Sequence, residues 1–239
     1  MFLKKLIKRQ IEKAGYRIIK PNLRQDHLLR RMKLLDTYEI NKILDVGANT
    51  GQYASIIRNA GFNGKIMSFE PLSAAYKTLK NNSNSDYNWE ALNFGLGNFD
   101  GESLINISGN TESSSFLNML PAHIRIRPES KFVGTEKVNI KKLDSIFNNL
   151  VNEGDTVFLK IDAQGYEYNI LEGARNSLNN IEGLQIEMSI EQLYEGEKLI
   201  CEMIGYLGAK GYKLMSIEPG SVDYSTGQMF QVDGIFFKR

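Results

Sequence analysis

Short runs of apolar residues alternate with helical patterns from residue 42 onward. The apolar runs cover residues 42–46, 65–70, 89–94, 156–162, 183–190, 212–218 and 230–237. Between them, helical patterns run up to Ala60, from about Ser73 to Lys80, from Glu167 to about Asn179 and from about Gly196 to Ala209. This alternation predicts an α/β fold with a mostly parallel, twisted sheet of about seven strands and helices on both faces.

Two stretches interrupt this alternation. ESLINIS (102–108) and EKVNI (136–140) predict the strands of a hairpin, and a segment rich in Gly, Ser, Thr and Asn (109–135) separates them. Loops of that length inside compact domains are usually functional lids or disordered. The turn-rich link 219–227 predicts a second hairpin, which would place one antiparallel strand at the edge of the sheet.

The first 38 residues lie outside the alternation and predict a basic helical extension before a single domain at 39–239. Residues 1–33 hold eleven Lys and Arg against two acidic residues, a formal charge of +9, whereas the remainder carries −8. Pro21 ends or kinks the helix. Its apolar stripe comprises Leu3, Ile7, Ile11, Ala14 and Ile18. Such a stripe can lie on its own domain, mediate dimerisation with a second subunit, or make peripheral contact with an anionic membrane surface.

Composition excludes several classes of protein. The formal net charge of +1 gives no general case for binding nucleic acid, so we expect no nucleic-acid partner. Cys201 is the single cysteine, which excludes an intramolecular disulfide and a thiolate cluster and fits a reducing compartment. No apolar run is long enough to cross a bilayer or to form the core of a secretory signal. We therefore expect a cytoplasmic protein.

A glycine-rich turn at residues 45–51 follows the first apolar run and opens a helix. Gly47 and Gly51 let the backbone turn tightly and approach a ligand, and the helix N-terminus offers unpaired N–H groups. A dinucleotide fingerprint would need glycine at 49 and 52, where Asn49 and Gln52 stand. Asp45 suits a cation, such as the amino group of a methionine moiety, held directly or through water.

Glu70 ends the second apolar run, nineteen residues after Gly51. An acidic residue at this position in nucleotide-binding α/β folds accepts the ribose hydroxyls of an adenosine. The spacing therefore predicts that Glu70 binds ribose.

Four segments together resemble the FkbM family of methyltransferases, whose members use S-adenosylmethionine: LDVGANTGQYA (44–54), SFEP (68–71), LKIDAQGYEYNILEGA (159–174) and QVDGIFF (231–237). They occur in the family's order, and the resemblance covers roughly residues 40–238. It implies a Rossmann-like class I methyltransferase fold. By this resemblance, the cofactor positions are Asp45, Gly47, Ala48, Asn49, Gly51 and Glu70, with Asn93, Phe94 and Gly95 near the adenine.

Lys160 and Asp162 belong to the family's most characteristic segment. On a strand they share one face and reach the C-terminal edge of the sheet, where ligands bind in open α/β folds. Asp162 is predicted to act as a general base toward a hydroxyl or to bind a metal, while Lys160 keeps it ionised or orients the acceptor. A purely structural ion pair for Lys160 is the alternative. Gln164 stands where many relatives carry an acidic residue.

Two further residues are candidates for the acceptor side of the site. Glu187 ends the next apolar run on the same edge, where it would line the acceptor pocket, assist Asp162 or serve structure. His123 lies in the 109–135 segment beside Arg125 and Arg127, so closure of that segment could bring it to the acceptor. No His, Cys or Glu spacing matches a zinc site, so we expect no metal.

These features predict an S-adenosylmethionine-dependent methyltransferase. The resemblance implies that it methylates a hydroxyl oxygen of a sugar, glycan or other small-molecule natural product. N-methylation of an amine is an alternative within enzymes. A non-catalytic cofactor-binding or scaffolding module is a second alternative, against which the intact Asp45, Glu70, Lys160 and Asp162 argue.

Overall fold

The structure is a computed structural model that describes residues 9–15 and 22–238, and its centre is a twisted sheet. Within these residues the sheet has seven strands, in the spatial order β3 (Trp89–Leu92), β2 (Lys65–Phe69), β1 (Lys42–Val46), β7 (Val157–Ile161), β8 (Ile181–Ser189), β10 (Gln231–Lys238) and β9 (Tyr212–Pro219). Strands β3, β2, β1, β7 and β8 run parallel. The predicted α/β class and the mostly parallel sheet are confirmed.

The sequence predicted that the antiparallel strand lies at the edge of the sheet, and this prediction is wrong. β10 pairs antiparallel with both β8 and β9, so it lies one place in from the edge, and β9 forms the edge. The reason is that the last hairpin inserts its second strand beside β8. β10 is almost entirely buried, whereas β9 alternates between buried and exposed residues, as expected for an edge strand.

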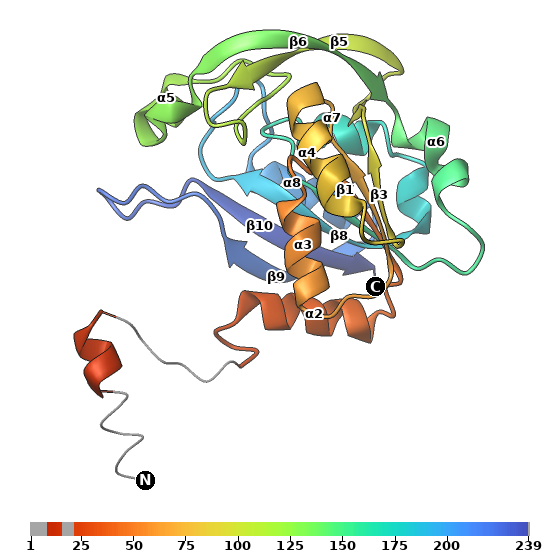
Figure 1. Cartoon of the computed structure of the whole chain (residues 1–239), viewed down its shortest axis with the longest axis horizontal. Coiled ribbons are helices and arrows are strands. Elements are labelled where there is room, and N and C mark those ends of the chain that lie inside the picture. The colour runs from red at the N-terminus through yellow and green to blue at the C-terminus, as the bar shows by residue number, and fades with distance from the viewer. Residues whose placement is uncertain (1–8, 16–21, 239) are drawn as a thin grey trace.

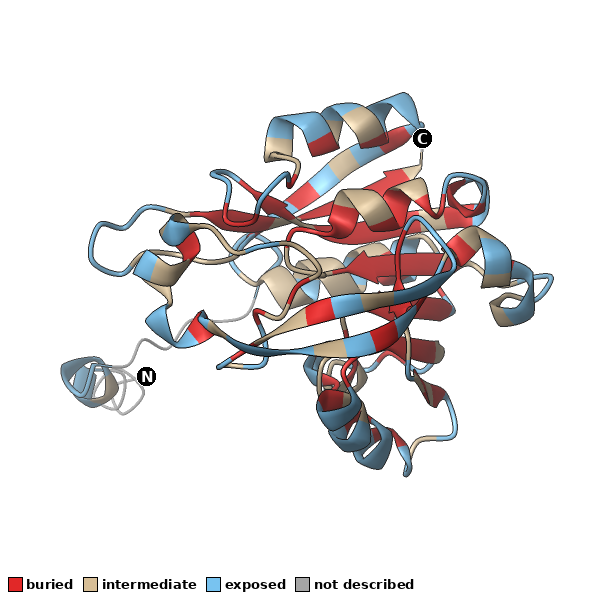
Figure 2. Ribbon diagram, turned by 90° about the horizontal axis from the view of Figure 1, so that it is seen from above, coloured by how far each residue is buried: buried red, intermediate tan, exposed pale blue. Residues whose placement is uncertain are grey.

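Helices cover both faces of the sheet and enclose two hydrophobic cores (Figures 1 and 2). One face packs against α2 (His27–Thr37), α3 (Gln52–Asn59) and α4 (Ser73–Ser83). The other packs against α6 (Leu143–Leu150), α7 (Glu167–Glu172) and α8 (Ile200–Ala209). The central strands β1 and β7 are buried along their whole length, which explains why they read as continuous apolar runs in the sequence.

Two predicted helices are shorter than their sequence patterns. The first stops at Glu172, and the N–H of its C-cap Gly173 donates to backbone oxygens. A separate 3-10 turn, η2 (Ser177–Asn180), follows where Asp144 accepts hydrogen bonds from the N–H groups of Asn176 and Ser177. The other helix begins at Ile200, where the side chain of Glu202 caps the N–H of Leu199.

A second, three-stranded sheet lies over the carboxyl ends of the main strands (Figure 1). It contains β4 (Gly95–Leu96), β6 (Phe132–Lys141) and β5 (Gly101–Ser108), and β5 and β6 form the predicted hairpin. The segment between them holds α5 (Pro121–Ile126) and a 3-10 turn, η1 (Pro128–Ser130). This segment packs on Leu193, Tyr194 and Phe230, so it is a folded cover rather than a free loop.

The predicted N-terminal extension divides into two parts. Residues 9–13 are helical, and the other positions of the predicted apolar stripe, Leu3, Ile7 and Ile18, lie outside the described residues. Helix α2 packs on the main sheet: Leu35 is buried, Arg30 donates to the Ser216 hydroxyl, and Arg31 pairs with Glu218 on β9. In the described part of the chain, no helix has the length and apolar character needed to cross a lipid bilayer.

Candidate active site

Two adjoining cavities open at the carboxyl ends of β1, β2, β7 and β8. The polar cavity is lined in part by Arg31, Tyr53, Arg127, Lys160, Glu187 and Asp233. The apolar cavity is lined in part by Phe69, Glu70, Leu72, Gly95, Leu96 and Phe116. Five residues line both cavities and therefore mark their junction: Gly47, Asn49, Glu112, Asp162 and Gln164.

The glycine-rich turn brings β1 and β7 together at this junction. Gly47 has a φ of +74°, and a Cβ atom there would lie 1.8 Å from the carbonyl oxygen of Asp162. A side chain at position 47 would therefore push the two strand ends apart. Ala48 lines the polar cavity, whereas Gly51 lines neither cavity and faces the ring of Trp89 instead.

Glu70 lies on the wall of the apolar cavity, fixed by backbone donors. Its Oε2 accepts from the N–H of Asn49 and its Oε1 from the N–H of Leu72, both at 2.8 Å. Burial raises its pKa to about 7 against these donors, which lower it. Each carboxylate oxygen keeps a further lone pair for a ligand hydroxyl. The side-chain oxygen of Asn49, beside it, is buried without a hydrogen-bond partner, so this wall fits the ribose of S-adenosylmethionine.

Asp45 lies beneath the site and lines neither cavity. It is 0% exposed, its Oδ2 accepts from the Ser68 hydroxyl at 2.9 Å, and its Oδ1 lies 3.3 Å from Lys160 Nζ. Asp45 thus pairs with Lys160. Its predicted contact with the ligand, direct or through water, stays a prediction.

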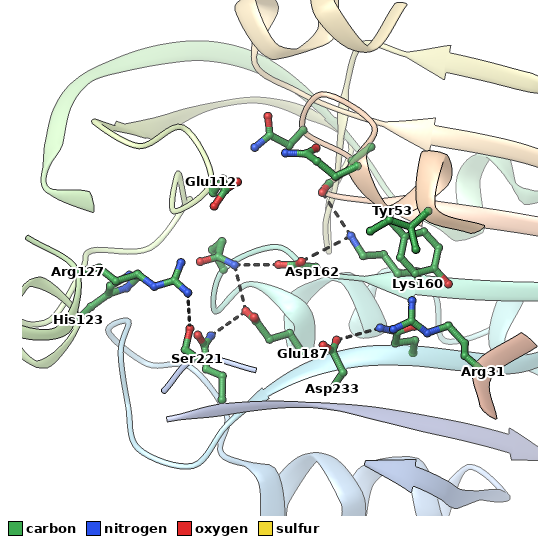
Figure 3. Close-up of a pocket in the computed structure, with 18 residues that line it drawn as sticks. Arg31, Tyr53, Glu112, His123, Arg127, Lys160, Asp162, Glu187, Ser221 and Asp233 are labelled. Carbon is green, nitrogen blue, oxygen red and sulfur yellow. Dashed lines mark hydrogen bonds and ion pairs between the residues drawn. The ribbon is translucent and has the colours of Figure 1, made fainter. Parts of the chain in front are cut away.

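Lys160 joins Asp45 to the junction. Its Nζ lies 3.7 Å from Asp162 Oδ2, and it faces the ring of Tyr53 (Figure 3). Burial opposes its charge, but Asp45 and Asp162 together raise its pKa above the ordinary value. The two carboxylates thus favour the charged form of Lys160, and the expected pairing with Asp162 is present.

Asp162 is the most exposed member of this group, with 37% of its side chain accessible. Gln164 donates to Asp162 Oδ1 at 2.8 Å and to Glu187 Oε2 at 3.0 Å, with a φ of 54° that turns its side chain toward both. The amide at position 164 thus links two carboxyl groups where an acidic residue would repel them.

Glu187 lines the polar cavity beside Asp162, as the sequence predicted. Gln231 donates to its Oε2 at 2.7 Å, in addition to Gln164. Burial, with Asp162 and Glu167 nearby, raises the pKa of Glu187 well above its usual range. Glu187 is therefore the buried acid of this pair, whereas Asp162 is the partly exposed one at the junction.

The segment expected near the adenine is only partly in place. Gly95 lines the apolar cavity. Asn93 instead donates to the backbone oxygens of Glu70 and Pro71, and the ring of Phe94 packs against Phe69, so neither lines that cavity. The strand ends at Leu92 and turns these side chains away. Phe116, from the segment over the site, lines the cavity and was not anticipated.

One end of the polar cavity is built from residues that the sequence reading missed. Arg31 on α2 lies over the ring of Tyr53, with 5.3 Å from guanidinium carbon to ring centroid. Asp233 on β10 accepts from Gln185 at 3.1 Å, and burial raises its pKa. The QVDGIFF segment was recognised only as a family motif, and nothing in the periodicity placed α2 against the site.

The opposite end of the polar cavity comes from the segment over the site. His123 is 2% exposed, lies edge-on to the Tyr194 ring, and has a buried Nδ1 without a hydrogen-bond partner. Burial lowers its pKa to about 4, so its ring is neutral at pH 7. Arg127 beside it donates to the Ser221 hydroxyl at 3.0 Å (Figure 3). His123 thus lines the polar cavity, and its predicted role toward the acceptor stays a prediction.

Among residues 9–15 and 22–238, no group of three or more His, Cys, Asp or Glu side chains is arranged to hold a metal ion. The carboxyl groups near Asp162 are linked through glutamine amides instead.

Several solved structures and one protein family are similar to this chain. Solved structures with similar folds include TehB from Haemophilus influenzae (9% identity, 96% of this chain and 65% of that chain, TM-score 0.49). Sp1610 from Streptococcus pneumoniae, in complex with S-adenosyl-L-methionine, has 11% identity over 87% of this chain and 72% of that chain, with a TM-score of 0.47. The methyltransferase domain of bacterial CtHen1-CN has 11% identity over 90% of this chain and 100% of that chain, with a TM-score of 0.48.

Similarities of this size carry no argument about what the chain binds, and no curated protein matches it in sequence. A family model, in contrast, matches the sequence. The methyltransferase FkbM domain matches residues 45–214, which is well over half of the chain and includes the glycine-rich turn and the 159–174 segment. The chain therefore belongs to the FkbM family of S-adenosylmethionine-dependent methyltransferases.

Proposed function

We propose that the protein transfers a methyl group from S-adenosylmethionine to a hydroxyl oxygen of a polar small-molecule or glycan acceptor. One observation carries this proposal: Asp162 is a partly exposed carboxylate at the junction of an apolar and a polar cavity. A base for the acceptor must be within reach of both donor and acceptor, and this junction offers that place.

The apolar cavity and the glycine-rich turn would hold the donor. Glu70 would accept the ribose hydroxyls, with Asn49 beside it, and Phe116 and Leu72 would cover the adenine. Gly47 and Ala48 would let the methionine part pass toward the polar cavity. When bound, S-adenosylmethionine supplies an electrophilic methyl group on a sulfonium centre.

Asp162 would accept the proton that the acceptor hydroxyl loses as its oxygen forms the new bond to the methyl carbon. The carbon–sulfur bond breaks, so the products are a methyl ether and S-adenosylhomocysteine. Lys160 would lie beside Asp162 as its counter-charge, and Gln164 would orient the Asp162 side chain. Glu187, Gln231 and Gln185 would offer hydrogen bonds to further polar groups of the acceptor.

Two measurements test the proposal. Isothermal titration of the full chain with S-adenosylmethionine should show saturable binding, and a non-catalytic module with a closed pocket would release no heat. Mass spectrometry of extracts incubated with methyl-labelled S-adenosylmethionine should then detect a product that carries one labelled methyl group on oxygen. A labelled methyl on nitrogen would replace the hydroxyl acceptor with an amine.

A further inference from the structure

Arg127 faces the polar cavity without a carboxylate partner. The two other cations that line this cavity are paired, Lys160 with Asp45 and Asp162, and Arg31 with Glu218. Within the described residues Arg127 forms no ion pair, and its side chain donates only to the Ser221 hydroxyl, at 3.0 Å. A guanidinium carries five donors in a fork that matches a carboxylate or phosphate group.

The backbone holds Arg127 in place. Its carbonyl oxygen accepts from the N–H of Ser130 at 2.9 Å and from the Ser130 hydroxyl at 2.6 Å, and its own N–H donates to the His123 carbonyl at 2.9 Å. Helix α5 before it is tied down by the N–H of Leu120, which donates to the Leu193 carbonyl at 2.8 Å. The guanidinium is thus positioned before a ligand arrives, which lowers the entropic cost of binding.

A second polar group on the same wall also lacks a partner. The Nδ1 atom of His123 is buried without a hydrogen bond, although buried polar atoms are normally paired. His123 and Arg127 both line the polar cavity. Figure 3 shows Arg127 and Ser221 at one end of the cavity and Arg31 and Tyr53 at the other, with Asp162 and Glu187 between them.

The other acidic residues of the cavity do not occupy Arg127. Asp162, Glu187 and Asp233 are held by Lys160 or by glutamine amides. Glu112 lies where the two cavities meet, and the structure contains no ion pair between Glu112 and Arg127 in the part that it describes. The Arg127 end is therefore the part of the cavity suited to negative charge.

We propose that the acceptor carries an anionic group, a carboxylate or a phosphate, which Arg127, Ser221 and His123 bind while the reacting hydroxyl lies at Asp162. This inference rests on the proposed function, because it takes the polar cavity as the acceptor site. It narrows the substrate class to hydroxylated acids and phosphorylated polyols. Arg127 is thus a specificity-determining residue.

The test compares three sugar probes on the full chain saturated with S-adenosylmethionine: glucose, glucuronate and glucose 6-phosphate. We expect the wild type to bind at least one anionic probe about tenfold or more tightly than glucose, as measured by saturation-transfer NMR titration. Arg127→Gln should lose that preference, because a charged hydrogen-bond pair contributes about ten- to a hundredfold in affinity. Glucuronate and glucose 6-phosphate distinguish a carboxylate from a phosphate acceptor.

Arg125→Gln is the matched control, since it removes the same charge from an exposed position of α5 that does not line the cavity. It should keep the wild-type preference and the wild-type affinity for S-adenosylmethionine. Arg127→Lys keeps the charge but not the forked donors of the guanidinium. Its preference for an anionic probe over glucose should lie between that of wild type and that of Arg127→Gln. It replaces Arg127→Gln in the test if that variant does not fold.

Three results would overturn the inference. The wild type could show no preference for an anionic probe, or Arg125→Gln could lose as much of it as Arg127→Gln. Thirdly, Arg127→Gln, but not Arg125→Gln, could bind S-adenosylmethionine more weakly than wild type, which would assign the guanidinium to the carboxylate of the methyl donor. Failure of the proposed function would look different, because the wild type would then not bind S-adenosylmethionine, and Arg127 could still be compared by titrating inorganic phosphate.

Discussion

Lys160 is shared by two carboxylates that differ in exposure and therefore in role. Asp45 is fully buried and accepts from the Ser68 hydroxyl, whereas Asp162 is partly exposed at the junction of the two cavities. A buried cation needs a fixed counter-charge, which Asp45 supplies. Asp162 thus keeps part of its side chain open to the cavities while it lies 3.7 Å from Lys160.

We expect Asp162→Asn to reduce turnover by about a hundred- to ten-thousandfold, because the amide cannot accept the acceptor's proton. Affinity for S-adenosylmethionine should change little, since Glu70 and the glycine-rich turn would still hold the donor. Single-turnover kinetics and calorimetry measure the two quantities separately. Near-normal turnover in this variant would make Asp162 structural and leave Glu112 as the remaining carboxylate at the junction.

Glu70 and Asp45 should respond differently to removal of their charge. Glu70→Gln should weaken S-adenosylmethionine binding about tenfold or more, because Glu70 lines the apolar cavity. Asp45→Asn should mainly lower the free energy of unfolding, by about 1–3 kcal/mol, because it leaves Lys160 with one carboxylate fewer in a buried position. Calorimetry and urea unfolding of both variants provide the comparison. The opposite pattern, a stable Asp45→Asn that binds the donor poorly, would restore a direct cofactor contact.

Glu167 makes the stability of the protein depend on pH. Burial, and then the nearby charges of Asp162 and Glu197, raise its pKa from 4.5 to about 8, although it accepts from the N–H groups of Ala163 and Gly165. A carboxyl group whose pKa is higher in the folded state favours folding while it is protonated. Its contribution is complete below pH 4.5 and is lost as the pH rises through about 8.

Glu167→Gln keeps a neutral acceptor at this position, so it should remove that part of the pH dependence. Relative to wild type, we expect the variant to gain up to about 4 kcal/mol in free energy of unfolding between pH 5 and pH 8.5. Urea unfolding at both pH values measures the difference. Glu153→Gln, at an exposed position, serves as the control and should show no such gain. A constant offset between Glu167→Gln and wild type would show that Glu167 ionises normally.

At the scale of elements, patterns that depend on neighbours in the sequence were predictable, and those that depend on distant contacts were not. Continuous apolar runs predicted the buried strands β1 and β7, and the glycine-rich turn predicted the start of α3. The insertion of β10 inside the edge strand depends on which strand pairs with β8, which periodicity does not encode. Likewise, the contact of α2 with β9 rests on Arg30 and Arg31, which read as part of a basic arm.

The same distinction applies to the site. The sequence could place four site residues because they lie on strands or directly after them: Lys160 and Glu187 on strands, and Glu70 and Asp162 directly after them. Phe116, Arg127 and His123 come from the segment over the site, whose position is set by packing against Tyr194 and Phe230. Of these three, only His123 was a candidate from the sequence, because it lies in the 109–135 segment beside Arg125 and Arg127.

Tyr194 connects this cover to Gln164 in the 159–174 segment. Its buried hydroxyl lies 3.0 Å from the Ser113 carbonyl oxygen and 3.0 Å from Gln164 Oε1. Tyr194→Phe should lower the free energy of unfolding by about 1–2 kcal/mol and reduce turnover severalfold, because Gln164 loses an anchor and no longer fixes Asp162.

Tyr212→Phe is the matched control for this change. Tyr212 is also a buried tyrosine whose hydroxyl bonds to two backbone oxygens, of Leu178 and Ile181, but it lies outside both cavities. It should lose comparable stability and keep full turnover. If both variants lose turnover equally, the effect is one of general stability rather than of Gln164.

At the scale of the whole molecule, the N-terminal region combines two different roles in one basic stretch. Its charge of +9 over residues 1–33 opposes −8 over the rest of the chain. Yet α2 belongs to the folded body, because Leu35 is buried in its core and Arg31 lines the polar cavity. We therefore propose that the separable extension ends before α2, at about residue 20, and that the remaining residues fold as one domain.

Two truncations test this division. Removal of residues 1–20 should leave the melting temperature and S-adenosylmethionine affinity nearly unchanged, because the residues that hold the donor and α2 remain. Removal of residues 1–37 should lower the free energy of unfolding by at least about 2–5 kcal/mol, since it takes away a buried leucine together with the Arg31–Glu218 ion pair.

The shorter truncation also identifies the extension's partner. In one outcome, wild type binds anionic vesicles at low salt and releases them as ionic strength rises, while the truncated chain does not bind them. That result assigns the basic stripe to a membrane surface. A change in mass by sedimentation, with no vesicle binding at any salt, assigns it to a second subunit. Equal stability of both truncations would place α2 outside the domain and remove Arg31 from the account of the polar cavity.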